Sequence, residues 1–285
     1  MKKVKKPVWI AILIVCIAVL IGGAVFLINY FRPPVEDSLS RDDFTEATEP
    51  ATEPATEAAT AAPTQPATQK PTMNHFGYKT AEEPEDWSGL SFDELTEKNP
   101  DIYAWIYIPG TAVDYPVCQS SEDEYEDFYL DHNIYRQYQF SGTIYSQKMN
   151  SRDFDDPVTV LYGHNMLNGS MFASLHNFEN EQFFNDYNTI FVFTKDSLLT
   201  YLVYSAYTYD DRHLLYSYHM EFEDSFRDYL DSTLNPHTYE GIVREGVELD
   251  TDSRILTLST CTNGGGNTRY LVQGVLVDVQ PREQQ

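Results

Sequence analysis

Residues 256–261 read LTLSTC, residues 262–267 read TNGGGN, and an apolar run follows at 269–279. Apolar residues alternate with small polar ones in LTLSTC, which predicts one short β-strand. The glycine-rich TNGGGN predicts a turn, so the two runs form a hairpin. This hairpin places Cys261 at the end of one strand and Arg269 near the start of the next. An arginine keeps its charge and can stabilise a neighbouring thiolate.

A second strand-like run, VTVLY at residues 158–162, leads through a turn-permitting Gly163 to His164. Functional groups are commonly carried on loops that a sheet holds in place. A histidine beside a cysteine can accept the thiol proton and later protonate an amine leaving group. The histidine precedes the cysteine in this chain, which is the reverse of the order in papain-like proteases.

These motifs together resemble the sortase family, and class B sortases in particular. The resemblance covers roughly residues 90–279, and its motifs are TLSTC (257–261) with Arg269, YGHNM (162–166), MFASL (171–175) and LTEKNPDIYAWIYIPGTAVDYPVCQ (95–119). It implies a cysteine transpeptidase with Cys261 as nucleophile, His164 as acid/base and Arg269 as oxyanion or substrate clamp. It also implies cleavage of a C-terminal sorting signal after Thr through a thioacyl-enzyme. The secreted protein is then transferred to an amine of a cell-wall peptidoglycan precursor, or of a pilin.

Four further residues are expected to contact the substrate. Ser259 shares a strand face with Cys261 by the two-residue period of a strand. Tyr162 lies on the face of His164 by the same period. Thr260 and Thr262 flank the cysteine.

The group that orients His164 is left open by the sequence. Class B sortases often place an Asp soon after the strand at residues 142–145, where this chain has Ser146 and Gln147. Asp153 and Asp155 are the alternative candidates.

No metal or other cofactor is expected. Neither an HExxH motif nor a paired Cys/His spacing occurs in the sequence. The remaining histidines are expected at the surface; these are His75, His132, His176, His213, His219 and His237. Cys118 is expected to pack as a small apolar residue, and Cys16 lies in an apolar N-terminal run.

The composition and charge of the chain limit the classes of partner that it can bind. The chain has 285 residues and a formal net charge of −25. Binding nucleic acid requires clustered Lys and Arg, so a nucleic-acid partner is excluded. Acidity of this size is typical of a well-solvated extracellular surface.

The chain divides into four parts. Residues 1–7 are lysine-rich and predict a cytoplasmic tail, and residues 8–30 carry no charge and are long enough for a single transmembrane helix. A cleaved signal peptide is the alternative, but the run lacks a small-x-small cleavage site. Residues 31–85 are rich in Thr, Pro and Glu and predict a disordered linker. Residues 86–281 form the catalytic domain, outside the cell.

The catalytic domain is expected to be mainly β with α insertions. Residues 91–94 form a capping box that opens a short N-terminal helix. Strands are expected near 102–108, 113–117, 142–146, 158–162, 187–194 and 198–209, and helices at 171–184 and at 221–234, before the cysteine strand. Many short strands with inserted helices predict a barrel or a sandwich. The resemblance implies the closed sortase barrel of about eight strands.

Three other functions remain compatible with the sequence. They are a sortase that polymerises pilins, a thiol peptidase that releases its product to water, and a catalytically silent barrel that binds envelope proteins. Residue spacing alone does not separate transfer from hydrolysis.

Overall fold

The computed structural model describes residues 73–84, 87–238, 241–263 and 267–282. The predicted cytoplasmic tail at 1–7, the membrane anchor at 8–30 and most of the linker lie outside these residues. Within the described residues, no helix is both long and apolar enough to cross a membrane.

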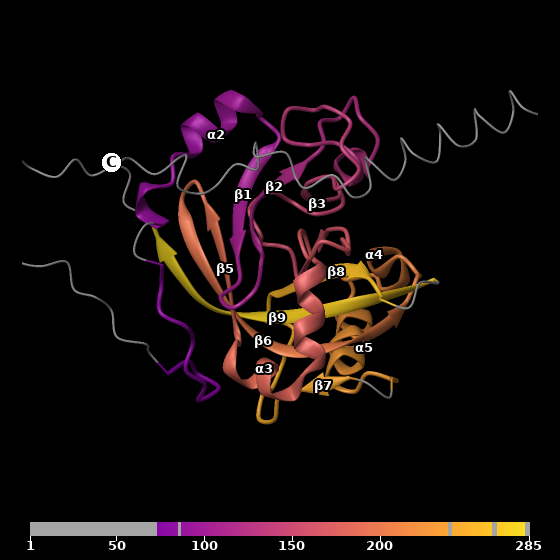
Figure 1. Cartoon of the computed structure of the whole chain (residues 1–285). Coiled ribbons are helices and arrows are strands. Elements are labelled where there is room, and N and C mark those ends of the chain that lie inside the picture. Colours follow the sequence, from indigo (N-terminus) through magenta and orange to yellow (C-terminus); the bar gives the residue numbers. More distant parts are fainter. Residues whose placement is uncertain (1–72, 85–86, 239–240, 264–266, 283–285) are drawn as a thin grey trace, which may run out of the picture. The chain divides into compact units, whose positions relative to one another are not determined.

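The domain is built on a β-barrel. Its strands are β1 (Ile102–Tyr107), β2 (Asp114–Gln119), β3 (Ile144–Ser146), β4 (Val158–Tyr162), β5 (Thr189–Thr194), β6 (Ser197–Asp210), β7 (Ile242–Val243), β8 (Ile255–Cys261) and β9 (Thr268–Pro281). The order β5-β1-β2-β3-β4-β8-β9-β6 is closed by pairing of β5 with β6, while β7 pairs on β6 outside the ring (Figure 1). The pairs β2–β3 and β4–β8 are parallel. The predicted barrel of about eight strands is confirmed.

Helices fill the connections between strands. They are η2 (Trp87–Gly89), α2 (Phe92–Lys98), η3 (Phe128–Leu130), η4 (Ala173–Glu179), α3 (Glu181–Asp186), α4 (Leu214–Ser217) and α5 (Glu223–Leu234). The Ser91 side chain caps α2 by accepting a hydrogen bond from the Glu94 amide at 3.3 Å, as the capping-box pattern predicts. Helix α5 precedes the cysteine strand β8, which is also as predicted.

The barrel interior is one apolar cluster to which every strand of the ring contributes. Its members include Ala104, Val117, Ile144, Leu161, Ile190, Val203, Leu258 and Val272. Because strand residues alternate between faces, the odd-numbered residues of β8 lie on the outer face of the barrel. Phe226 and Tyr229 of α5 pack on this outer face against β4, β8 and β9. Helix α5 therefore covers the outer face of these strands, whereas Cys261 at the end of β8 is exposed.

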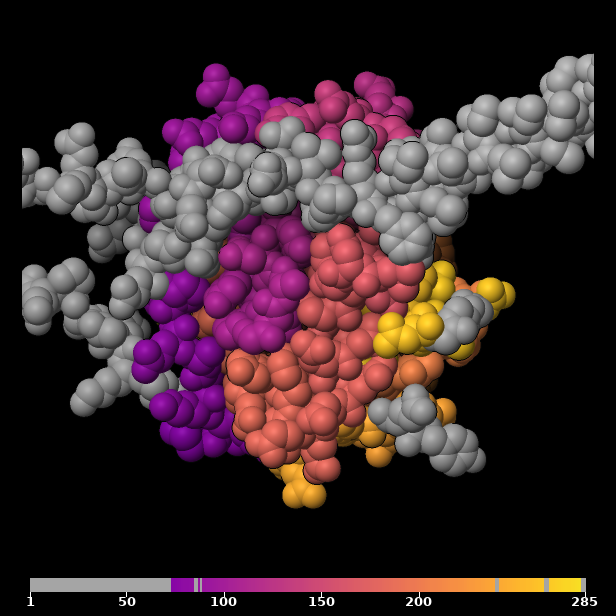
Figure 2. Space-filling model, viewed as in Figure 1, coloured from indigo at the N-terminus to yellow at the C-terminus, as the bar shows by residue number. Residues whose placement is uncertain are grey.

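The N-terminal described segment, residues 73–84, packs on the barrel. The Ala81 amide donates to the Thr189 hydroxyl at 2.8 Å, and the Asn188 side-chain amide donates to the Lys79 carbonyl at 2.9 Å. Figure 2 shows this segment, in indigo, against the barrel surface. The sequence assigns these residues to the linker because few of them are apolar, but Phe76 and Tyr78 pack beside the outer cluster. The other residues of the predicted linker, 31–72 and 85, lie outside the described residues.

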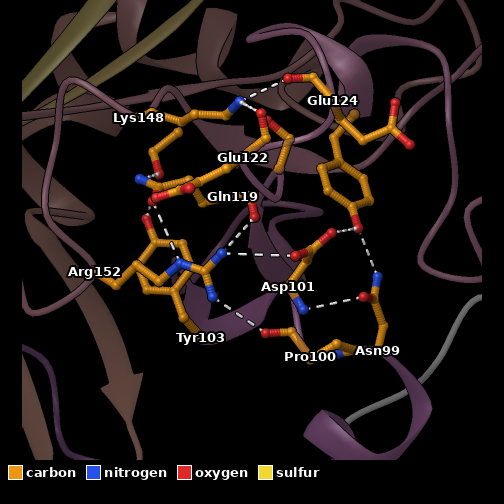
Figure 3. A network of polar contacts seen from close by, with 12 residues as sticks. Asn99, Pro100, Asp101, Tyr103, Gln119, Glu122, Glu124, Lys148 and Arg152 are labelled. Atoms are coloured by element: carbon orange, nitrogen blue, oxygen red, sulfur yellow. Dashed lines mark hydrogen bonds and ion pairs between the residues drawn. The ribbon is translucent and has the colours of Figure 1, made fainter.

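A buried carboxylate ties the start of β1 to the neighbouring loops (Figure 3). Asp101 accepts a hydrogen bond from the Tyr129 hydroxyl at 2.7 Å and pairs with the Arg136 guanidinium. Arg152 approaches the same carboxylate at 3.6 Å and donates to the Gln119 carbonyl at 2.8 Å. A buried charge requires such partners, so this network fixes the loop that runs from β2 to β3.

Cys118 lies at the end of β2, fully buried in the cluster beneath α2. Burial is the main cause that raises the pKa of its thiol well above the ordinary value. The residue is a free cysteine of the core, as predicted.

Candidate active site

The β8–β9 hairpin brings Cys261 and Arg269 together. The two residues are direct cross-strand partners in the antiparallel ladder. Side chains of such partners lie on the same face with Cβ atoms about 5 Å apart. Cys261 is exposed, and Arg269 is partly buried. The structure thus places an accessible thiol beside a guanidinium, as the sequence predicts.

His164 follows β4, which runs parallel to β8. Tyr162 is the register partner of Ser259, and the Gly163 amide donates to the Ser259 carbonyl at 3.2 Å. The parallel strands β4 and β8 therefore end at the same edge of the barrel, and this edge carries both His164 and Cys261.

The ring of His164 is held by one hydrogen bond and one stacking contact. Its Nε2 donates to the Leu130 carbonyl at 2.8 Å, and Phe140 stacks on the ring at 5.4 Å. Burial lowers the pKa of His164, while the bond to Leu130 and the Asp131 charge act in the opposite direction. Since a carbonyl only accepts, Nε2 carries the proton, and the lone pair of the neutral ring lies on Nδ1.

Neither acidic candidate from the sequence is seen to bond this ring. Asp153 accepts a hydrogen bond from the Ser151 hydroxyl at 2.6 Å, and Asp155 pairs with Arg254. The orienting group is instead the backbone carbonyl of Leu130. A carbonyl carries no mark in the sequence, which is why it was missed.

The charge of Arg269 acts on two stacked phenols of the outer face. Tyr145 and Tyr162 stack at 5.4 Å. Burial raises the pKa of both phenols above the usual range, Asp127 adds to this, and the Arg269 charge partly offsets it. Arg269 also donates to the Thr268 carbonyl at 3.1 Å. As the cross-strand partner of Cys261, Arg269 lies on the same face of the sheet as the cysteine.

The four expected substrate contacts divide between the two faces of the sheet. Ser259 and Tyr162 lie on the outer face with Cys261, although Ser259 is largely buried. Thr260 is opposite the core residue Tyr270, so its buried side chain faces the barrel interior. The Thr262 hydroxyl bonds the Thr268 hydroxyl at 2.6 Å across the hairpin. The alternation of faces thus separates Thr260 from Ser259 and Tyr162.

Two residues at the site were not singled out in the sequence. Asn165 donates from Nδ2 to the Cys261 carbonyl at 3.0 Å, and His176 donates from Nε2 to the same oxygen at 2.9 Å. The side chain of His176 is only 8% exposed, so the expectation of a surface histidine was wrong. Its position next to the MFASL motif was the one available signal.

Among the residues that the structure describes, no group of three or more His, Cys, Asp or Glu side chains is arranged to hold a metal ion. The functional groups at this site are the thiol of Cys261, the imidazole of His164 and the guanidinium of Arg269. Such a set suits attack on a carbonyl by the cysteine.

Comparison with known proteins gives the family. Residues 106–277 match the family model of the sortase domain. The chain is 33% identical over 189 residues to sortase B of Listeria monocytogenes, covering 65% of this chain and 73% of that protein. It is 27% identical over 190 residues to sortase B of Staphylococcus aureus, covering 66% and 75%. The solved structure of Clostridium perfringens sortase B matches with a TM-score of 0.56 and 32% identity, covering 66% of this chain and 100% of that one.

A closed barrel with a cysteine and an arginine paired at one strand end is the architecture of a cysteine transpeptidase, and this chain belongs to the sortase family. Within that family it is a homologue of sortase B. Sortases act at the cell envelope on proteins that carry sorting signals.

Proposed function

We propose that Cys261 is the nucleophile, His164 the acid/base and Arg269 the oxyanion donor of a sortase B-type reaction. The observation that carries the proposal is the cross-strand pair of Cys261 and Arg269, which a hydrogen bond from Asn165 joins to the histidine loop. The other cysteines support the assignment. Cys118 is enclosed in the core, and Cys16 belongs to the predicted anchor.

The first half-reaction acylates the enzyme. The Cys261 thiolate attacks the carbonyl carbon of the Thr residue in the sorting signal, and negative charge develops on its oxygen. Arg269 and the backbone N–H that follows Cys261 stabilise this charge. The C–N bond then breaks, and the imidazolium of His164 gives its proton to the leaving amine. The product is a thioester between the secreted protein and Cys261.

The second half-reaction transfers the protein. An acceptor amine of a peptidoglycan precursor attacks the thioester carbonyl and loses a proton to His164. The C–S bond breaks and Cys261 leaves as the thiolate. Ser259, Tyr162 and Thr262 lie around the nucleophile and are proposed to contact the sorting signal, whereas Thr260 supports the strand from the interior.

The same proposal includes the location of the enzyme. Residues 8–30 anchor the chain in the cell membrane with residues 1–7 in the cytoplasm, and residues 31–72 tether the barrel outside. A tether of this kind raises the effective concentration of the domain near membrane-bound precursors.

Mass spectrometry of peptide products tests the proposal. The purified full chain in detergent is incubated with a panel of sorting-signal peptides, with and without oligoglycine or diaminopimelate. We expect cleavage after Thr and ligation that depends on the amine. Both disappear in Cys261→Ala, whereas Cys118→Ala retains them. Full activity of Cys261→Ala would contradict the proposal.

The same experiment separates the alternatives. Cleavage that ignores the amine identifies a thiol peptidase. Ligation to a pilin lysine, but not to a wall-type amine, identifies a pilin polymerase. The absence of a covalent adduct with every peptide favours a catalytically silent barrel.

A further inference from the structure

We propose that His176 and Asn165 are positioning residues that hold the Cys261–Thr262 peptide in the orientation needed for the oxyanion hole. The inference rests on the proposed function, because it concerns how the N–H after Cys261 is presented. Neither residue touches the reacting atoms. They act through the backbone of the nucleophile.

The first observation is that two side-chain donors converge on one backbone oxygen. The Cys261 carbonyl accepts from Asn165 at 3.0 Å and from His176 at 2.9 Å. A carbonyl oxygen has two lone pairs, so both bonds can be made together. The Asn165 Nδ2 and His176 Nε2 atoms are also within hydrogen-bond distance of each other, at 3.1 Å. The Cys261 carbonyl is therefore held in one direction.

The second step is the geometry of the peptide unit. A trans peptide is planar, and its C=O and N–H point in opposite directions. The Cys261 carbonyl points to the β4 side of β8, as the Ser259 carbonyl does toward Gly163. The Thr262 N–H therefore points to the β9 side, where Arg269 lies opposite Cys261. When the Cys261 carbonyl is held in place, the Thr262 N–H is held on the side of β8 where β9 and Arg269 lie.

The third observation is that both donors are themselves fixed. Glu179 faces Nδ1 of His176 at 2.5 Å, and the ring of Tyr270 stacks on the imidazole at 4.8 Å. Acceptor oxygens thus lie next to both ring nitrogens of His176. The second N–H of the Asn165 amide is directed to the Asn263 side chain at 2.9 Å.

The arrangement also joins separate parts of the chain. His176 and Glu179 belong to η4, which crosses β9 in Figure 1, and Asn165 directly follows His164. Donors on the Cys261 carbonyl polarise the peptide and make its N–H a stronger donor. Asn165 and His176 therefore orient the Thr262 N–H and also make it a stronger hydrogen-bond donor to the oxyanion.

The test compares acylation with alkylation of Cys261 in the full chain. Acylation by p-nitrophenyl acetate forms an oxyanion and needs no sorting signal. Alkylation by iodoacetamide attacks an sp³ carbon, displaces iodide and forms no oxyanion. Damage to the hole slows the first reaction only, whereas damage to the thiolate or to the fold slows both.

Two substitutions of His176 give opposite expectations. His176→Phe keeps a ring on Tyr270 but removes the donor, and we expect acylation to slow by about 10-fold, less than the loss of a whole oxyanion donor. We expect alkylation to stay within about 2-fold, because no oxyanion forms. His176→Gln, which retains an N–H near the position of Nε2, restores acylation. His219→Phe is the matched control, since that histidine is exposed beside Glu221.

Two results would overturn the inference: unchanged acylation in His176→Phe, or equal slowing of acylation and alkylation. An Asn165→Ala and His176→Phe double variant guards against compensation by the remaining donor. If Cys261→Ala retained ester turnover, the proposed nucleophile would be wrong. This result is distinct from a failure of the inference about His176, because His176 is unchanged in that variant.

Discussion

At His164, burial and polar contacts act on protonation in opposite directions, and burial is the larger cause. The pKa is lowered from 6.5, because the charged ring is poorly solvated. We therefore expect the NMR titration of the His164 ring to have its midpoint below 6.5. The acidic limb of the pH–rate profile should follow it, since the neutral ring is the base.

The Asp131→Asn variant provides a second test of the pKa predicted for His164. The Asp131 charge raises the pKa of His164, so its removal should move the midpoint to still lower pH. Asp153→Asn is the control, because that carboxylate bonds Ser151. A midpoint above 6.5 would contradict burial as the dominant cause, and a midpoint that rises in Asp131→Asn would contradict the effect assigned to the Asp131 charge.

Arg269 allows a second prediction at the scale of one residue. Arg269→Ala should lower the rate of acylation by about 100-fold, the typical cost of removing one oxyanion donor. Arg269→Lys keeps the charge but loses the planar fork, so it should recover only part of this loss. Rapid-quench mass spectrometry of the thioester measures the effect. Arg227→Ala, an exposed site on α5, serves as the control, and equal rates in both alanine variants would rule out the role.

The side chains at the site were easier to predict than their partners. Cys261, Arg269 and His164 lie at the ends of strands that local alternation reveals. Asn165 and His176 reach the Cys261 carbonyl through tertiary packing, which leaves no local pattern. The sequence analysis explains Gly163 by a turn, but the structure gives a different reason for a glycine at this position. A Cβ there would lie 2.5 Å from Ile144 and 2.8 Å from Phe172, so close packing, not the turn, requires glycine.

At the scale of elements, the loop that carries Leu130 determines where the His164 ring lies. Gly142 has a φ of +59° beneath this loop, and a Cβ at this position would meet the carbonyl oxygens of Leu130 and Tyr129. Gly142→Ala should therefore displace the acceptor of His164 and reduce acylation on the order of 10-fold.

Gly246→Ala is a matched control for the Gly142 prediction. Gly246 has a φ of +72° and no atom within 4 Å of an added Cβ. Both variants carry the cost of a left-handed backbone, about 1–2 kcal/mol. A difference in activity between them therefore reports the contact with Leu130. Equal activities would show that this loop does not position the histidine.

Helix α5 supports the cysteine strand through a buried hydrogen-bond network. The Tyr229 hydroxyl lies 2.9 Å from that of Thr257 and donates to Gln273 at 3.1 Å. Tyr229→Phe should lower the free energy of unfolding by about 1–2 kcal/mol, because a buried polar group loses a partner. Urea denaturation measures this, and Tyr216→Phe at an exposed site should have no effect. Equal stability of both variants would contradict the structural role.

The elements themselves were largely predictable, whereas their pairing was not. Alternation and turn residues predicted β4 with the bounds that the structure shows, and β8 and β9 to within two residues at each end. The parallel pairings β2–β3 and β4–β8 join strands far apart in the chain, and no local pattern encodes them. The resemblance to sortases implied a closed barrel of about eight strands but not these pairings.

At the scale of the whole domain, the ring closes through β5 and β6, and the segment at residues 73–84 packs across this region. The Tyr78 hydroxyl donates to the Glu245 carbonyl, and the guanidinium of Arg244 lies 4.9 Å from the Tyr78 ring and 4.5 Å from that of Phe184. Arg244 also donates to the Val203 carbonyl at 2.8 Å. The segment is thus part of the folded domain.

This packing predicts where the folded domain begins. A fragment that starts at residue 87 should unfold more easily than one that starts at residue 73. Full burial of one large apolar side chain contributes about 1.5–3 kcal/mol, and Phe76 and Tyr78 are both partly buried, so the difference in the free energy of unfolding should be about 2 kcal/mol. Acylation of Cys261 under folding conditions should be the same in both fragments, since these residues contact β5, β6 and the end of β9 near Leu276 and Gln280, which is remote along the strand from Arg269. Urea titration of the fragments, with Tyr78→Ala in the longer one, measures the contribution. Equal stability of the two fragments would show that residues 73–84 belong to the tether, as the sequence alone suggests.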